Sequence, residues 1–302
     1  MTRRRRTLAA LGLLLAATSL LTACGSSGSG PPPAGDGISA VFNEIYDGDF
    51  DANNANAPYE RFDIVYVAFA HIDRTTHALD FEAKVGKQVE RERLAALKAN
   101  TAELRAAGAL KLVISLGWGE QEQVSDDDQT PLLEAYIDEV APSIRRFVDE
   151  YELDGFDIDY ETPRFTSAAK FREVAQKVRA ALGDDYLFTI TPNNTDQLDG
   201  AALRRYFDYV NAQSYNADMD SDFSVGDLTR IGVPAAMIVA GADIENVNHY
   251  QDDANRVAWA INQYDGGRLA GVFIWQLKPA AQLFPGGRFV DYADQVWNAT
   301  HP

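Results

Sequence analysis

The sequence predicts an α/β fold, a closed (β/α)8 TIM barrel in a single domain, and three observations lead to this prediction. Eight short runs rich in Val, Ile, Phe and Tyr alternate with longer segments whose apolar residues repeat with a helical period. Repeated strand-then-helix units imply right-handed crossovers and a parallel sheet. Residues 37–302 carry these units and have about the usual length of such a barrel, ~250 residues. An open doubly wound sheet is the alternative, although no G-x-G-x-x-G motif follows the first strand.

The predicted strands are spread along the whole domain. We place them at residues 38–46, 62–72, 110–119, 155–161, 186–192, 209–216, 235–242 and 269–277. After the fourth strand, apolar residues at helical spacing predict a helix within residues 166–183. Thr166 or Ser167 can cap its start, and Gly183 can end it.

Another helix is predicted between the third and fourth strands, over residues 130–151. Thr130 is placed as its N-cap, and the proline that follows suits the first helical position. Pro142 lies further along the same segment, where it has no N–H to donate to the helix. We therefore expect Pro142 to kink or break this helix.

The first 23 residues predict a secretory signal of the lipoprotein type. A cluster of four arginines precedes an apolar run that is too short for a comfortable membrane span. The ending Leu-Thr-Ala-Cys resembles a bacterial lipobox, which would make Cys24 the first mature residue and the site of lipid attachment. Ordinary cleavage nearby is the alternative, and the arginines leave Sec and twin-arginine export both open.

Residues 24–36 are rich in Gly, Ser and Pro and predict a tether between the membrane surface and the domain. Cys24 is the only cysteine, so the chain cannot form an intramolecular disulfide. We expect an extracytoplasmic protein, lipid-anchored to the bacterial cell membrane or secreted, that contacts the membrane only through the lipid on Cys24.

The chain is strongly acidic, with a formal net charge of −18. Removing the first 23 residues, which contain four arginines and no acidic residue, makes this −22. Such a field repels nucleic acid and anionic polysaccharides but leaves neutral substrates unaffected. We therefore expect a neutral partner and no nucleic acid, while for the charge as a whole we favour a role in solubility alone. We also expect a monomer.

The segment DGFDIDYE, residues 154–161, carries the strongest chemical signal. Asp157, Asp159 and Glu161 share one face of the predicted fourth strand, and the bulky apolar residues between them take the other. Three carboxylates ~6 to 7 Å apart in an enclosed site cannot all ionise freely, so one should hold a proton and can act as a general acid. The alternatives are a metal site and a solvated acidic strand. Against a metal site, the segment lacks the glycine and the distal glutamate of a calcium-binding loop, and no histidine lies close in the sequence.

This segment matches the D-x-x-D-x-D-x-E signature of glycoside hydrolase family 18, the chitinases and endo-β-N-acetylglucosaminidases. Further resemblance lies in YVAFA on the second predicted strand, KLVISLGWG on the third, FDYVNAQSYN on the sixth and GVFIWQL on the eighth. The matches occur in the family's order and span the whole domain.

The resemblance implies retaining hydrolysis of β-1,4 bonds after N-acetylglucosamine in chitin, chitooligosaccharides or the chitobiose core of N-glycans, without a cofactor or metal. Glu161 would protonate the glycosidic oxygen and later activate water, while the acetamido oxygen of the substrate acts as nucleophile. Asp159 would orient the acetamido group, Asp157 would share a proton with Asp159, and Tyr215 would contact the acetamido oxygen. A lectin-like protein on the same fold that binds N-acetylglucosamine without cleaving it is the alternative; a solute-binding lipoprotein fits the anchor but not the motif.

Other positions carry over as substrate-binding residues. Trp275 would form the floor beneath the reacting sugar, and Gln213 and Asn216 stand where many chitinases have Met and Asp. Phe69 follows a non-proline peptide bond that is often cis in the family, so we predict cis bonds at Ala68-Phe69 and Trp275-Gln276.

Four motif residues complete the comparison. Ser115 and Gly117 match the family's S-x-G-G strand, but Trp118 replaces its second glycine and either lines the cleft or seals the barrel mouth. Asp154 has the wrong parity for the site and should secure the turn into the strand. The short connection before the last strand leaves no room for an inserted domain, so we expect an open, shallow cleft. The acidic run 126–128 is expected to be solvated surface.

Overall fold

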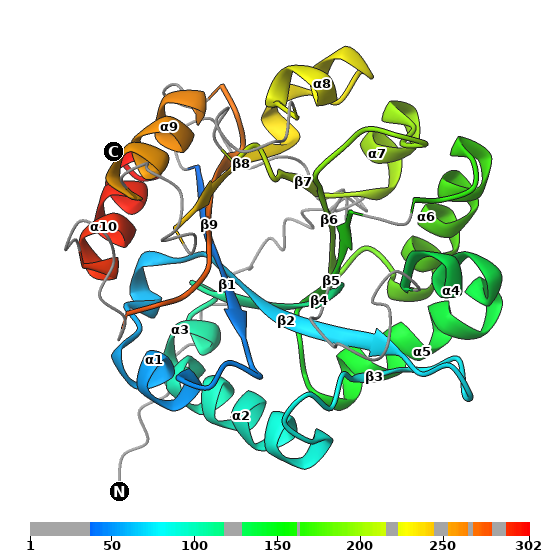
Figure 1. Cartoon of the computed structure of the whole chain (residues 1–302), viewed down its shortest axis with the longest axis horizontal. Helices are drawn as coiled ribbons and strands as arrows, with labels where there is room; N and C mark the ends of the chain where they lie inside the picture. Colours follow the sequence, from blue (N-terminus) through cyan, green and yellow to red (C-terminus); the bar gives the residue numbers. More distant parts are fainter. Residues whose placement is uncertain are drawn as a thin grey trace, which may run out of the picture. The chain divides into compact units, whose positions relative to one another are not determined.

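The computed structural model describes residues 37–117, 129–161, 164–215, 223–244, 253–264, 268–279 and 288–302. All of them belong to one compact unit, Pro31–Pro302. Eight parallel strands close into a barrel because β1 pairs with β9 on one side and with β2 on the other (Figure 1). The predicted (β/α)8 barrel is confirmed.

The barrel strands coincide with the eight predicted ones. They are β1 (Ile38–Glu44), β2 (Ile64–Ile72), β4 (Lys111–Leu116), β5 (Gly155–Tyr160), β6 (Leu187–Pro192), β7 (Tyr209–Ala212), β8 (Ile238–Asp243) and β9 (Gly271–Trp275). One further strand, β3 (Leu79–Phe81), pairs antiparallel with β2 and was not predicted. With only three residues, β3 is too short to give a periodic signal.

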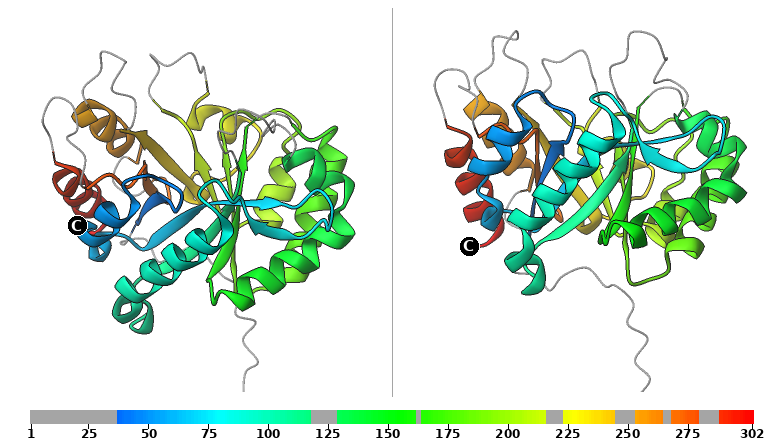
Figure 2. Two further views of the ribbon diagram at one scale, coloured as in Figure 1. Left: turned by 60° about the horizontal axis from the view of Figure 1, so that its bottom comes forward. Right: turned by 90° about the horizontal axis from the view of Figure 1, so that it is seen from below.

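Helices surround the strands on the outside of the barrel (Figures 1 and 2). They are α1 (Phe50–Asn56), α2 (Lys87–Asn100), α3 (Ala102–Ala106), α4 (Gln129–Ala135), α5 (Ile137–Glu150), α6 (Ala168–Leu182), α7 (Gly200–Tyr206), α8 (Val225–Arg230), α9 (Asp253–Tyr264) and α10 (Phe289–Thr300), with short 3-10 turns η1 (Tyr59–Arg61) and η3 (Ala235–Met237). Within the described residues, no helix has the length and apolar character that a membrane crossing requires.

Two apolar cores lie on the two sides of the barrel strands, and successive side chains of a strand take opposite sides. On β1, Val41 joins the larger core between strands and helices, whereas Phe42 joins a smaller one inside the barrel. There the Phe42 ring stacks on Tyr66, with ring centroids 4.6 Å apart. This alternation follows from the two-residue period of a strand and leaves the inward positions near the strand ends available for a site.

The acidic strand follows the same rule. Phe156, Ile158 and Tyr160 of β5 are buried in the outer core, at most 1% exposed. Their burial fixes the opposite orientation for the aspartates between them. The predicted division of this strand into an apolar and an acidic face is therefore confirmed.

The helix predicted over residues 130–151 is divided, but not at Pro142. The interruption lies at Tyr136, between α4 and α5, and Pro142 sits inside α5. Pro142 is exposed, and so is Asp138, whose carbonyl loses its helical partner and can bond to water instead. The buried apolar stripe of α5 holds the helix together across the proline.

The helix caps predicted for α6 are present, whereas the one predicted at Thr130 is not. The Ser167 hydroxyl caps α6 by accepting from the backbone N–H of Lys170, at 3.2 Å, and Gly183 ends that helix with a φ of +80°. Thr130, predicted as an N-cap, already lies within α4, which begins at Gln129. Helix ends are the least certain part of a sequence-based prediction because they depend on local hydrogen bonds.

Candidate active site

A cavity of about 270 Å³ opens at the carboxyl ends of the barrel strands. Barrel enzymes carry out their chemistry at this end. The described residues that line the cavity are Phe42, Glu44, Tyr46, Phe69, Lys84, Asp159, Glu161, Thr191, Gln213, Tyr215, Asp243 and Trp275. Six of the residues predicted for the site are among them: Phe69, Asp159, Glu161, Gln213, Tyr215 and Trp275.

Asp157 lies behind this cavity and is fully buried. Ser115 of β4 donates to its Oδ2 at 2.7 Å, and Thr189 of β6 donates to its Oδ1 at 2.6 Å. Thr191 lies 3.0 Å from both carboxylate oxygens and itself accepts from Asn211 at 3.0 Å. Burial raises the pKa of Asp157 to about 6, although the hydroxyl donors oppose the rise.

Asp159 lies two residues after Asp157 on β5 and lines the cavity. The Gln213 amide donates to its Oδ1 at 2.8 Å and also to the backbone carbonyl of Thr191 at 2.9 Å, so Gln213 is held in one orientation. Gly117 makes room for the carboxylate, because a Cβ at this position would lie 2.4 Å from the Cβ of Asp159. The predicted motif glycine thus has a steric reason.

Glu161 follows the last residue of β5 and is partly buried in the cavity wall. Asn193 donates from Nδ2 to Glu161 Oε2 at 3.2 Å, and Asn194 donates to the Glu161 backbone carbonyl at 3.1 Å. Burial raises the pKa of Glu161, and a hydrogen bond with Gln213 opposes this rise. A carboxyl group that retains its proton more readily than usual suits a general acid.

Aromatic rings also line the cavity. Trp275 stacks against Phe69 with ring centroids 5.9 Å apart, and it tilts against Phe42 at 5.4 Å. Tyr215 meets Phe273 edge to face at 6.0 Å. Apolar ring faces in one cavity with carboxylates and amides suit a sugar, which has an apolar face and polar edges.

Both predicted cis peptide bonds, Ala68-Phe69 and Trp275-Gln276, are confirmed. Asp154 is not part of the cavity lining. Its Oδ2 accepts from the backbone N–H of Leu112 at 2.8 Å and from Arg105 Nε at 3.2 Å. Asp154 therefore joins the start of β5 to β4 and α3.

Three predicted site residues, Cys24, Trp118 and Asn216, lie outside the described residues, and so does the acidic run 126–128. In the parts of the chain that the structure describes, no three His, Cys, Asp or Glu side chains are grouped so that they could hold a metal ion.

The other six lining residues were not among the predicted site residues: Phe42, Glu44, Tyr46, Lys84, Thr191 and Asp243. Glu44 and Asp243 are the last residues of β1 and β8, within two residues of the ends of the predicted strands, so inspecting the acidic residues near each predicted strand end would have found both. Tyr46 lies two residues beyond Glu44 and donates to its Oε1 at 2.9 Å. Lys84 follows the unpredicted strand β3, and no pattern in the sequence indicates its position.

Comparison with known proteins agrees with this geometry. The sequence model of glycosyl hydrolases family 18 matches residues 44–263. A class V chitinase from Nicotiana tobaccum superposes with a TM-score of 0.68 at 14% identity, covering 88% of this chain and 99% of that one. A GH18 chitinase from Cycas revoluta superposes with a TM-score of 0.67 at 15% identity, covering 88% of this chain and 100% of that one. A chitinase from Bacteroides thetaiotaomicron superposes with a TM-score of 0.63 at 19% identity, covering 88% of this chain and 95% of that one.

These structural similarities show a shared barrel fold, and the family match covers more than half of the chain. The acidic strand, its position in the barrel and the family match therefore agree. This chain belongs to family 18 of the glycosyl hydrolases and is a glycoside hydrolase.

Proposed function

We propose that the protein hydrolyses β-1,4 bonds after N-acetylglucosamine with retention of configuration, using the acetamido oxygen of the substrate as nucleophile. One observation carries this proposal: Asp159 and Glu161 line the same cavity as Trp275 and Tyr215, and the buried Asp157 lies behind them. The arrangement supplies one proton donor, one group to orient an amide, and one apolar surface for a sugar ring.

In the first step the reacting sugar stacks on Trp275, and Glu161 donates its proton to the glycosidic oxygen. Asp159 accepts a hydrogen bond from the acetamido N–H, and the Tyr215 hydroxyl contacts the acetamido oxygen, which attacks the anomeric carbon. The bond to the leaving sugar breaks as the bond to the acetamido oxygen forms. The product is a positively charged oxazolinium ion, stabilised by the Asp159 carboxylate.

In the second step the ionised Glu161 takes a proton from a water molecule. The oxygen of this water attacks the anomeric carbon, and the bond to the acetamido oxygen breaks. Two displacements at the same carbon restore the original configuration. Glu161 ends the cycle protonated, ready for the next substrate, so no cofactor takes part in the sequence.

The substrate class that we propose is chitin, chitooligosaccharides or the chitobiose core of N-glycans. Two plant neighbours support saccharides of this kind: the Cycas revoluta chitinase was solved with (GlcNAc)3 and (GlcNAc)4, and the Nicotiana tobaccum chitinase with NAG4.

The direct test is Glu161→Gln, which replaces the acidic carboxyl group by an amide of nearly the same size and shape that cannot transfer a proton. We expect turnover of chitooligosaccharides to fall by about 10²- to 10⁴-fold while binding remains, because a positioned acid contributes about that much. Glu92→Gln, on the exposed surface of α2, serves as the matched control and should leave turnover unchanged.

Product analysis on chitooligosaccharides and N-glycopeptides would identify the bond and the anomer released. A glucose oligomer without acetamido groups should not be cleaved at a comparable rate. Equal turnover of that oligomer, or an unchanged rate for Glu161→Gln, would contradict the mechanism. Binding without turnover by the wild-type protein would favour the lectin-like alternative.

A further inference from the structure

Among the described residues that line the cavity, Lys84 is the one basic side chain, and four carboxylates line the same cavity: Glu44, Asp159, Glu161 and Asp243. Its Nζ lies 3.9 Å from the centroid of the Tyr46 ring and 3.6 Å from Glu82 Oε1. The side chain of Lys84 is only 12% exposed. Its ammonium is therefore held at the cavity wall and not in bulk water.

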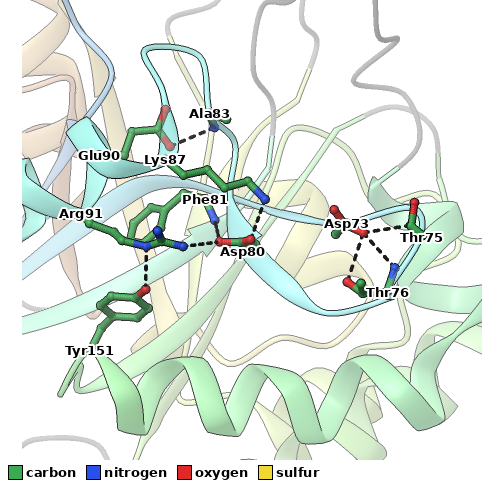
Figure 3. Close-up of polar contacts among 10 residues, drawn as sticks. All are labelled: Asp73, Thr75, Thr76, Asp80, Phe81, Ala83, Lys87, Glu90, Arg91 and Tyr151. Atoms are coloured by element: carbon green, nitrogen blue, oxygen red, sulfur yellow. Dashed lines mark hydrogen bonds and ion pairs between the residues drawn. The ribbon is translucent and has the colours of Figure 1, made fainter.

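The backbone that presents Lys84 has an unusual shape. Ala83 has a φ of +71°, in the left-handed region that non-glycine residues seldom occupy, and Gly86 has a φ of +97°. Glu90 of α2 is fully buried, and its carboxylate accepts the backbone N–H of Ala83 at 2.9 Å and of Val85 at 3.3 Å. Figure 3 shows the contact between Glu90 and Ala83. A buried carboxylate thus holds the turn in the conformation that points Lys84 into the cavity.

The same face of α2 fixes the strand before this turn. Lys87 donates to Asp80 Oδ2 at 2.6 Å, and Arg91 lies 3.6 Å from Asp80 Oδ1 while donating to the Tyr151 hydroxyl at 3.1 Å (Figure 3). Side chains from one helix therefore hold both β3 and the turn behind it. Non-glycine residues in the left-handed region are frequent at binding sites, where the surrounding structure holds them in place.

A series of rings connects Lys84 to the floor of the site. Trp275 stacks on Phe69 at 5.9 Å, Phe69 lies 6.5 Å from Tyr46, and Lys84 covers Tyr46. The rings of Phe69 and Tyr46 lie between Trp275 and Lys84. If one sugar stacks on Trp275, the next sugar of the same oligosaccharide can therefore reach Lys84. Hydroxyl and acetamido oxygens of that sugar are acceptors, and an ammonium offers three donors.

We propose that Lys84 is a specificity-determining residue that donates hydrogen bonds to the sugar next to the reacting N-acetylglucosamine. The inference rests on the proposed function, since it assumes that Trp275 holds the reacting sugar. It makes the enzyme selective for oligosaccharides long enough to reach Lys84, and it assigns the buried Glu90 a positioning role through the turn.

The test is Lys84→Met, which keeps an unbranched side chain over Tyr46 and removes the donors. For (GlcNAc)4 we expect KM to rise by ~10- to 100-fold, the usual worth of a hydrogen bond to a charged group, with kcat within about 2-fold. Lys84→Arg retains donors and charge and should recover most of the affinity. Lys98→Met, which also removes an ion pair with a glutamate, Glu152, lies outside the cavity lining and should leave KM unchanged.

A second variant separates substrate binding from simple charge balance with Glu82. If Lys84 only neutralises Glu82, the double variant Glu82→Gln/Lys84→Met should restore KM, and that result would overturn the proposal. We expect KM to stay raised in the double variant, and thermal melting of each variant reports whether it is folded.

The outcomes also distinguish this inference from the proposed function. A wild-type protein that neither binds nor cleaves (GlcNAc)4 would contradict the proposed function. Wild-type turnover combined with an unchanged KM in Lys84→Met would contradict only the role of Lys84.

Discussion

Replacing Asp157 with asparagine should stabilise the folded domain at neutral pH while lowering turnover. Asp157 is fully buried, and the charged form of its carboxyl group is disfavoured there, so its pKa is about 6 instead of the usual 3.8. Asparagine keeps the size of the side chain. The hydroxyls of Ser115, Thr189 and Thr191 can rotate to donate to its carbonyl oxygen and to accept from its amide.

The magnitude follows from the two pKa values. Because a pKa unit corresponds to about 1.4 kcal/mol, ionising Asp157 costs the folded state about 3 kcal/mol relative to the unfolded chain. The folded pKa is raised, so this cost is absent below pH 3.8, grows between pH 3.8 and about 6, and is fully present above that range. Asparagine carries no such cost at any pH.

The assay is urea denaturation of wild-type and Asp157→Asn protein at pH 4 and pH 7.5. The free energy of unfolding of the variant relative to wild type should increase by about 2 to 3 kcal/mol between the two pH values. Asp149→Asn is the control, because hydrogen bonds from Arg145 and Tyr186 lower the pKa of Asp149, so no gain toward neutral pH is expected.

A difference in unfolding free energy that does not change with pH would refute this reasoning. It would show that the neighbouring hydroxyls compensate fully for the burial of the charge. Turnover of Asp157→Asn should fall in either case if Asp157 shares a proton with Asp159, since asparagine has none to share in that way.

Two further predictions concern the motif glycine and the N-terminus. Gly117→Ala places a Cβ 2.4 Å from the Cβ of Asp159, and the displaced carboxylate should lower kcat/KM on chitooligosaccharides by about 10²-fold, whereas Gly48→Ala, with nothing within 4 Å, should have no effect. An undiminished rate for Gly117→Ala would mean that the exact place of Asp159 is unimportant. For the lipid anchor that we propose at Cys24, Cys24→Ser should move the protein from the membrane fraction to the soluble fraction without changing kcat or KM; continued membrane association would argue against the anchor.

Most of the barrel could be predicted from the sequence because strand and helix periods are local properties of the backbone. The two-residue period assigned Asp157, Asp159 and Glu161 to the face opposite the outer core, and the structure agrees. Local reasoning failed where a neighbouring element decides the outcome. Pro142 was expected to kink or break a helix, but α5 continues through it, held by its buried apolar stripe.

The candidate site divides in the same way. Its acid and aromatic residues stand in recognisable motifs at strand ends, so Glu161, Tyr215 and Trp275 were found from the sequence. Lys84 was not, because its position depends on a three-residue strand and on a buried carboxylate contributed by α2.

The sequence alone determined the number and order of the barrel strands, the inward face of the acidic motif and the family. Only the tertiary structure decided that Asp157 would be enclosed by hydroxyls from β4 and β6, that Gln213 would hold Asp159, and that Lys84 would reach the cavity. The physical reason is that some properties depend on residues close in the sequence and others on residues far apart. Backbone geometry sets which face a side chain takes within its own strand, whereas burial, pKa and hydrogen-bond partners depend on the register of strands and turns that lie far apart in the chain.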